Sequence, residues 1–114
     1  MKFLLQVRFN GAATVISALP PGEQQKVTAE FAAIRQFPGV LDGSQLQAPG
    51  TAATLRVDGG QAQVTNGPAV EPGNELDGYY IYEAPDLDEA IAFAAQIPVA
   101  RFGGTVELRP MLER

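Results

Sequence analysis

The segment that decides the fold reads Gly78-Tyr79-Tyr80-Ile81-Tyr82-Glu83-Ala84-Pro85-Asp86-Leu87-Asp88-Glu89-Ala90. Its first half is rich in tyrosine and predicts a strand, because aromatic and β-branched residues favour that conformation. Its second half predicts the start of a helix. Asp86 is a good N-cap residue, and Glu89 follows three positions later, at the spacing of a capping box. Pro98 ends this helix, so the segment indicates a mixed α+β domain.

The N-terminal third adds a strand and a helix. Residues 2–10 alternate between apolar and polar side chains, which predicts a strand with one buried face. Residues 21–36 carry apolar side chains at helical spacing, and the Phe-Pro-Gly run at 37–39 ends that helix. We expect residues 10–19, between these two elements, to form a loop with at most one helical turn.

The middle of the chain predicts a hairpin. Two alternating segments, 53–57 and 61–65, flank Asp58-Gly59-Gly60, and Asp-Gly between such segments is a strong hairpin signal. The preceding segment, residues 40–46, is ambiguous because Gly43 weakens it as a strand. The following residues 66–77 predict a loop, since they contain two prolines and two glycines.

A last alternating segment, residues 105–109, completes the order strand, helix, two or three hairpin strands, strand, helix, strand. This order predicts one α+β domain over residues 1–114, a ferredoxin-like split βαβ sandwich with two helices on one face of an antiparallel sheet. The opposite face would carry Leu4, Gln6 and Arg8 together with some of the tyrosines. Such a face is too apolar for water, so we expect a homodimer that packs sheet against sheet.

Composition excludes several classes of function. The 114 residues include neither cysteine nor histidine, which rules out Ser-His-Asp and Cys-His catalysis and thiolate-bound metals. The net charge is −5, so the chain lacks the excess of basic residues expected of a nucleic-acid-binding protein. Gly59-Gly60 and Gly103-Gly104 lack the context of a phosphate loop. We therefore expect no metal, no cofactor and no nucleic-acid partner.

We also expect a cytoplasmic protein without a membrane partner. No stretch approaches the roughly 20 apolar residues of a membrane-spanning helix. The apolar N-terminal run is interrupted by Gln6 and Arg8, too early for the apolar region of a signal peptide. The absence of cysteine fits a reducing compartment.

Several motifs resemble one known family. The run Val64-Thr65-Asn66-Gly67-Pro68-Ala69-Val70-Glu71 is similar to the Val-Thr-Asp-Gly-Pro-Phe-Ala-Glu core of the DGPF branch of the YCII-related family. Asp86-Leu87-Asp88-Glu89-Ala90 resembles that family's Ser-Leu-Asp-Glu-Ala helix start, and Val106-Glu107-Leu108-Arg109-Pro110 resembles its C-terminal element. The resemblance implies a dimeric α+β barrel of ferredoxin-like protomers. Many members of the family are associated with extracytoplasmic-function sigma factors.

The chain departs from the family pattern where chemistry is concerned. Asn66 replaces the motif aspartate, so one ionisable group is lost, and an amide cannot exchange protons. The histidine and aspartate pair invoked for catalysis in other YCII-related proteins is absent, because the chain has no histidine. Both departures weaken the hypothesis that the protein is an enzyme.

The candidate ligand-binding residues fall into two groups. Asn66, Gly67 and Pro68 could present backbone N–H groups or an amide side chain to a ligand, and the alternative is a simple turn. Arg56 and Arg101 could hold the carboxylate or phosphate of a small anionic ligand through bidentate hydrogen bonds. Their alternative role is in salt bridges.

The candidates for catalysis are Glu71 and Tyr80. Glu71 would serve as a base if a cleft raised its pKa, and the alternative is a solvated loop carboxylate. The three tyrosines at 79, 80 and 82 would either line a cleft or fill the dimer interface, and we favour interface packing.

Three functions remain open from the sequence. The first is a non-enzymatic dimeric module that binds a small ligand or acts as an accessory regulatory protein. The second is an enzyme of the lyase or isomerase type that acts on a small anionic metabolite with Glu71 or a tyrosine as acid or base. The third is a scaffold without a ligand, and the sequence alone does not decide whether the protein is an enzyme.

Overall fold

A four-stranded antiparallel sheet organises the protein. The computed structural model describes residues 1–113 and places the strands in the order β2 (Val40–Gln45), β5 (Gly78–Glu83), β1 (Lys2–Arg8) and β6 (Thr105–Pro110). β5 lies between β1 and β2, and β1 lies between β5 and β6. Each βαβ unit is thus split by a strand from the other, which confirms the predicted ferredoxin-like fold.

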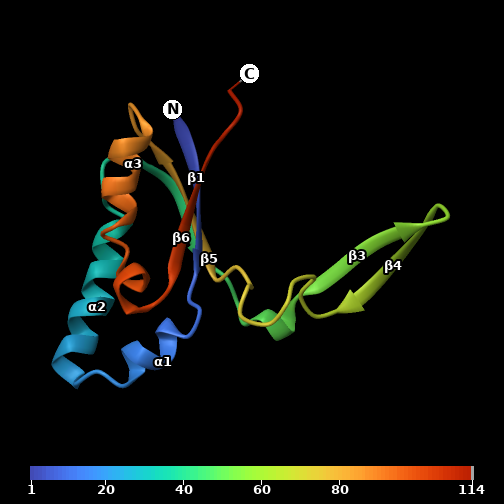
Figure 1. Cartoon of the computed structure of the whole chain (residues 1–114), viewed down its shortest axis with the longest axis horizontal. Helices are drawn as coiled ribbons and strands as arrows, with labels where there is room; N and C mark the ends of the chain where they lie inside the picture. Colours follow the sequence, from blue (N-terminus) through green and yellow to red (C-terminus); the bar gives the residue numbers. More distant parts are fainter. Residues whose placement is uncertain (114) are drawn as a thin grey trace.

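The helices lie on one side of this sheet, as Figure 1 shows. They are α1 (Ala12–Ser17), α2 (Pro21–Ile34) and α3 (Leu87–Ala94), with a short 3₁₀ helix, η2 (Pro98–Phe102), after α3. The predicted cap of α3 is confirmed, because the Glu89 backbone N–H donates to the Asp86 carboxylate at 2.9 Å. No helix among residues 1–113 has the length and apolarity needed to cross a membrane.

The expectation of only two helices was wrong, because α1 occupies residues predicted as a loop. A six-residue helix is not stable alone in water, so its formation depends on tertiary contacts. Ala12 is fully buried in the core cluster, and α1 packs against η2, which follows about 85 residues later in the sequence. That distant contact leaves no periodic signal in the local sequence.

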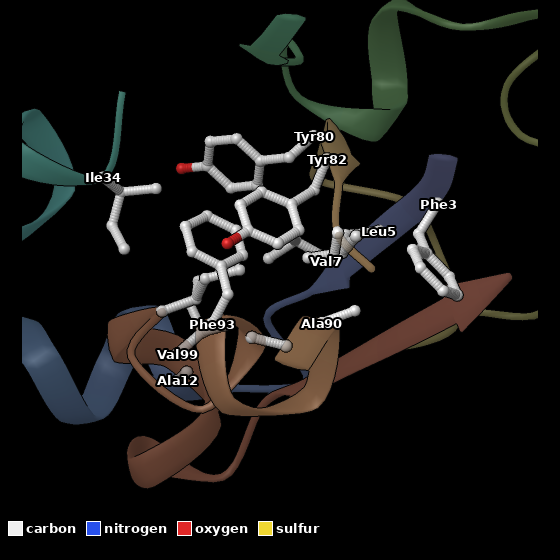
Figure 2. Packing of buried hydrophobic residues seen from close by; sticks show 13 residues of the cluster. Phe3, Leu5, Val7, Ala12, Ile34, Tyr80, Tyr82, Ala90, Phe93 and Val99 are labelled. Atoms are coloured by element: carbon white, nitrogen blue, oxygen red, sulfur yellow. The ribbon is translucent and has the colours of Figure 1, made fainter. Parts of the chain in front are cut away.

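The core lies between the sheet and α3. Phe3 and Leu5 of β1 are fully buried, and Phe93 of α3 stacks on Tyr82 with ring centroids 4.0 Å apart and an interplanar angle of 3°. The Tyr80 ring meets Phe93 edge-on, with centroids 6.3 Å apart. Figure 2 shows these three aromatic rings gathered beside the apolar residues of β1.

The tyrosines therefore divide between the two faces of the sheet. Tyr80 and Tyr82 lie under the helices in the core of their own chain, so the interpretation of these two as interface residues was wrong. Tyr79 lies on the opposite face, where its hydroxyl donates to the Asp42 carboxylate at 3.4 Å. That face, which we call the open face, has no helix on it (Figure 1).

The ambiguous segment around Gly43 is the edge strand β2. Gly43 pairs with Tyr80 of β5, and a Cβ atom at this glycine would lie only 2.6 Å from the tyrosine ring. The Tyr80 ring thus covers the site where a side chain would be. The glycine that weakens the strand in the sequence is required by its neighbour in the sheet.

The predicted hairpin forms, but outside the main sheet. β3 (Ala53–Asp58) and β4 (Gln61–Asn66) make a separate two-stranded sheet, which we call the arm. Figure 1 shows the arm projecting from the side of the main sheet opposite the helices. The radius of gyration is 16.2 Å, whereas a compact domain of this length has about 13 Å. The arm accounts for this excess.

Candidate functional site

A cleft of about 540 Å³ lies between the sheet and the first two helices. One wall comes from α1 and α2, and the other comes from the ends of β1, β2 and β5. The lining residues are Val7, Phe9, Ala13, Ile16, Ser17, Val27, Thr28, Phe31, Ala32, Arg35, Ser44, Gln45, Asp77, Gly78, Tyr79 and Tyr80.

The body of the cleft is apolar because of how α2 sits on the sheet. Ile34, near the end of α2, is 3% exposed and belongs to the core cluster. Phe31 and Val27, about one and two turns earlier, face the cleft instead. Ile16 of α1 and Val7 of β1 also line the cleft, so apolar side chains lie on both walls. Such a surface favours a ligand with an apolar body.

Polar side chains interrupt this lining, among them Arg35, Asp77 and Tyr80. Arg35 lies at the end of α2, and within residues 1–113 no carboxylate lies within ion-pair distance of its guanidinium. The Asp77 carboxylate is already engaged, because it accepts a hydrogen bond from the Phe9 backbone N–H at 2.7 Å. Tyr80 also lines the cleft, and its phenol is a hydrogen-bond donor. The cleft thus combines a cation without a paired anion, a hydroxyl donor and a carboxylate that holds the loop after β1.

Burial controls the protonation state of Tyr80. Desolvation raises the pKa of this tyrosine above its ordinary value, and the positive charge of Arg35 opposes the shift without cancelling it. The phenol therefore keeps its proton at neutral pH. It can donate a hydrogen bond to an anion, but it offers no basic oxygen for proton abstraction.

The Asn66-Gly67-Pro68 turn closes the base of the arm. The Gly67 N–H donates to the Ala52 carbonyl at 2.7 Å, and the Gly67 carbonyl accepts from the Thr54 hydroxyl at 2.8 Å. Gly67 has φ of +104°, which favours glycine at this position. These contacts support the alternative role of the segment as a turn, because the Gly67 backbone groups are already paired.

The two predicted arginines lie far from one another. Arg101 of η2 makes a bidentate ion pair with Glu30 of α2, at 2.6 and 2.8 Å, on the helical side of the sheet. This hydrogen bonding lowers the pKa of Glu30 and raises that of Arg101. Arg56 lies on the arm, on the other side of the sheet (Figure 1). One protomer therefore does not bring Arg56 and Arg101 into a single site.

Of the two predicted catalytic residues, only Tyr80 lines the cleft. Glu71 lies exposed in the loop between β4 and β5 and is absent from the lining of the cleft. Among residues 1–113, no group of three or more acidic side chains is arranged to hold a metal ion.

A second hollow, of about 560 Å³, opens beside the open face around Arg8. The donors of this arginine are already in use. They bond to the Gln6 amide oxygen at 2.8 Å and the Asn74 carbonyl at 3.2 Å, and Glu107 lies at 3.7 Å. An anion would have to displace these partners, so this hollow is less suited to an anionic ligand than the cleft.

Arg35 is a site residue that was not predicted from the sequence. The signal was present in the spacing, because Val27, Phe31 and Arg35 follow one another at intervals of four and so share one face of α2. A cation that continues an apolar stripe marks the place where that stripe reaches a polar boundary. Nothing in the sequence shows that β2 and β5 would leave space opposite this stripe.

A split βαβ sheet with helices on one face and a projecting hairpin defines a ferredoxin-like α+β protein. The family model for the YCII-related domain matches residues 1–113, and the chain belongs to this family. The chain is 33% identical over 103 residues to an uncharacterized protein, R00369, of Rhizobium meliloti (strain 1021), with 86% of this chain and 83% of the relative covered. Membership of the YCII-related family, predicted from the sequence motifs, is thus confirmed.

One solved structure extends the comparison of folds. It is 5-chloro-2-hydroxyhydroquinone dehydrochlorinase (TftG) from Burkholderia phenoliruptrix AC1100, in complex with 2,5-dihydroxybenzoquinone. It is similar to this chain with a TM-score of 0.50 and 15% identity, covering 100% of this chain and 96% of that one. At this identity the likeness shows the shared fold.

Proposed function

We propose that this YCII-related protein binds a small organic anion with an apolar body in the cleft beneath α1 and α2, as a homodimer and without catalysis. The observation that carries the proposal is the Arg35 guanidinium, which has no ion-pair partner within residues 1–113, at the polar boundary of a mainly apolar cleft. A cytoplasmic location is part of the same proposal and rests on the absence of cysteine from the chain.

The size and lining of the cleft support a small ligand. Its volume of about 540 Å³ falls within the range of about 300–1,000 Å³ that is typical of small-molecule sites. Phe31 and Val27 would pack against the apolar body of the ligand. Arg35 would hold its carboxylate through two parallel hydrogen bonds, and the Tyr80 hydroxyl would donate a third.

The protonation state of the cleft argues against proton abstraction. Tyr80 is held neutral by burial, and Asp77 is bound to backbone. The chain contributes no histidine that could exchange protons near neutral pH. A binding role requires none of these groups to change its charge.

The second candidate is an enzyme of the lyase or isomerase type. It is favoured by the presence of Tyr80 in the lining of the cleft and by the fold shared with TftG, a dehydrochlorinase. Tyr80 would then act as a general acid toward the bound anion. Its test is substrate turnover by the native protein, with loss of turnover in Tyr80→Phe.

The open face supports the homodimer. Leu4 of β1 and Ile81 of β5 lie directly opposite one another at its centre, with Gln6 and Tyr79 as the next pair. Leu4 and Ile81 are half-buried, and within residues 1–113 no helix covers the side of the sheet opposite α1, α2 and α3 (Figure 1). A second sheet packed against this face would remove the apolar centre from water.

The binding proposal is tested by calorimetric titration with benzoate and with benzamide, which share an apolar ring and differ in charge. We expect benzoate to bind at least about tenfold more tightly, because a hydrogen bond to a charged group contributes about 1.5–3 kcal/mol. Arg35→Gln should abolish this preference. The matched control is Lys26→Gln, which removes a positive charge from the same helix outside the cleft.

Two results would count against the proposal. One is an equal affinity of the native protein for the acid and the amide. The other is a preference for benzoate that survives in Arg35→Gln or disappears in Lys26→Gln, because the anion would then not be bound at the cleft.

A further inference from the structure

The arm is amphipathic, and its apolar side is exposed. Leu55 pairs with Val64 and Val57 pairs with Ala62, so these four side chains form one face of the hairpin, which we call the apolar strip. Leu55, Val57 and Val64 are 61%, 67% and 66% exposed. The other face of the arm is polar, with the pairs Arg56–Gln63 and Asp58–Gln61.

Nothing in the described part of the chain covers this strip. No other helix or strand within residues 1–113 makes more than marginal contact with β3 or β4. The hydrogen bonds at its base, between Gly67 and both Ala52 and Thr54, connect the two strands of the arm to each other and not to the main sheet. An isolated two-stranded hairpin is marginally stable in water, so an arm with this pattern requires a surface to pack on.

The direction of the arm shows where that surface must be. The arm leaves the body on the side of the open face, away from the helices (Figure 1). Its six-residue strands are about 20 Å long, whereas two packed sheets lie about 10 Å apart. If a second copy packs on the open face, the arm is longer than the gap between the two sheets and must run alongside the body of that copy.

We infer that the apolar strip of each arm packs on the body of a second copy of this chain, so that the two protomers clasp one another. This inference rests on the proposed homodimer and extends it, because it assigns the arm rather than the open face alone to the interface. A two-fold axis makes the contact reciprocal, and both arms are covered at once.

The first test compares two double variants by sedimentation velocity. Leu55→Asp with Val64→Asp places two charges on the strip, and Gln61→Asp with Gln63→Asp places the same two charges on the polar face of the same arm. The first should weaken dimerisation by about 100-fold or more, since each contact occurs twice in the dimer. The second should leave it nearly unchanged, and circular dichroism should show an intact fold in both.

The results separate the inference from the proposals on which it rests. A native protein that is monomeric at micromolar concentration overturns the homodimer and the clasp together, while benzoate binding remains a separate measurement. A native dimer that persists in the strip variant overturns the clasp and leaves the open face as the interface. Equal weakening in both variants also overturns the clasp, because charge rather than loss of apolar contact would explain it.

A second test locates the contact. A photoreactive benzoylphenylalanine in place of Leu55 keeps the strip apolar and should give a covalent dimer on a denaturing gel. Mass spectrometry should place the cross-link in the partner outside its arm. Cross-links confined to the partner's arm, or the absence of a covalent dimer, would overturn the inference.

Discussion

Gly43 of β2 links the stability of the sheet to the shape of the cleft. A Cβ atom at this position would lie 2.6 Å from a ring carbon of Tyr80 and 3.0 Å from the Tyr79 carbonyl oxygen. Ordinary contact begins at 3.4 Å, so Gly43→Ala would have to displace the Tyr80 ring by about 0.8 Å. The neighbouring Phe93, whose ring meets that of Tyr80 edge-on, and the strand itself resist that movement.

We expect Gly43→Ala to lower the free energy of unfolding by about 1–3 kcal/mol, the usual cost of overpacking a filled site. In urea this corresponds to a midpoint lower by about 1 M for a domain of this size. The same variant should weaken benzoate binding, since Tyr80 lines the cleft. The matched control is Gly22→Ala in α2, where an added Cβ has open space and should be neutral or slightly stabilising.

The reasoning would be refuted by a Gly43→Ala variant whose unfolding free energy stays within about 0.5 kcal/mol of the native value, because surface-like substitutions fall in that range. A loss of stability with unchanged benzoate affinity would refute only the predicted effect of Gly43→Ala on ligand binding. The Tyr80 ring would then have moved without altering the cleft.

Three further predictions concern the core and the start of α3. Phe93→Ala should cost about 3–5 kcal/mol in chemical denaturation, because it removes a buried ring stacked on Tyr82; a cost below about 2 kcal/mol would contradict this. Asp86→Ala should lower the free energy of unfolding by about 1 kcal/mol, because the α3 cap is lost. Asp86→Asn should retain most of the stabilisation by the cap. Stability should fall as pH rises above about 10, because the raised pKa of Tyr80 keeps its proton in the folded state while the unfolded chain releases it. In a pH series of urea melts, Tyr80→Phe should lose this part of the alkaline sensitivity, and an unchanged series would exclude Tyr80 as its source.

The proposed ligand site and the proposed interface lie on opposite sides of one sheet. The cleft is formed by α1, α2 and the helical side of β1 and β5, whereas the open face and the arm point the other way (Figure 1). β5 contributes to both, since Tyr80 lines the cleft through its ring and Tyr79 lies on the open face. Substitutions in the arm can therefore be tested without altering the cleft.

The sequence by itself determined the elements whose signals are local. Alternation over residues 2–10 predicted β1, the Asp58-Gly59-Gly60 turn predicted the hairpin, and Asp86 with Glu89 predicted the start of α3. Each signal depends on residues a few positions apart, so no knowledge of distant partners is needed. Together with their order along the chain, they were sufficient for the ferredoxin-like fold.

The tertiary structure alone decided which partners these elements have. α1 forms because Ala12 is buried against distant residues, and β2 forms around Gly43 because the ring of Tyr80 covers it. Which tyrosines face the helices depends on the register of β5 against β1, and the cleft that Arg35 borders depends on how α1 and α2 lie on the sheet. Contacts between residues far apart in the chain leave no periodic pattern in the sequence. The cleft and the position of the arm outside the main sheet therefore could not be predicted from the sequence.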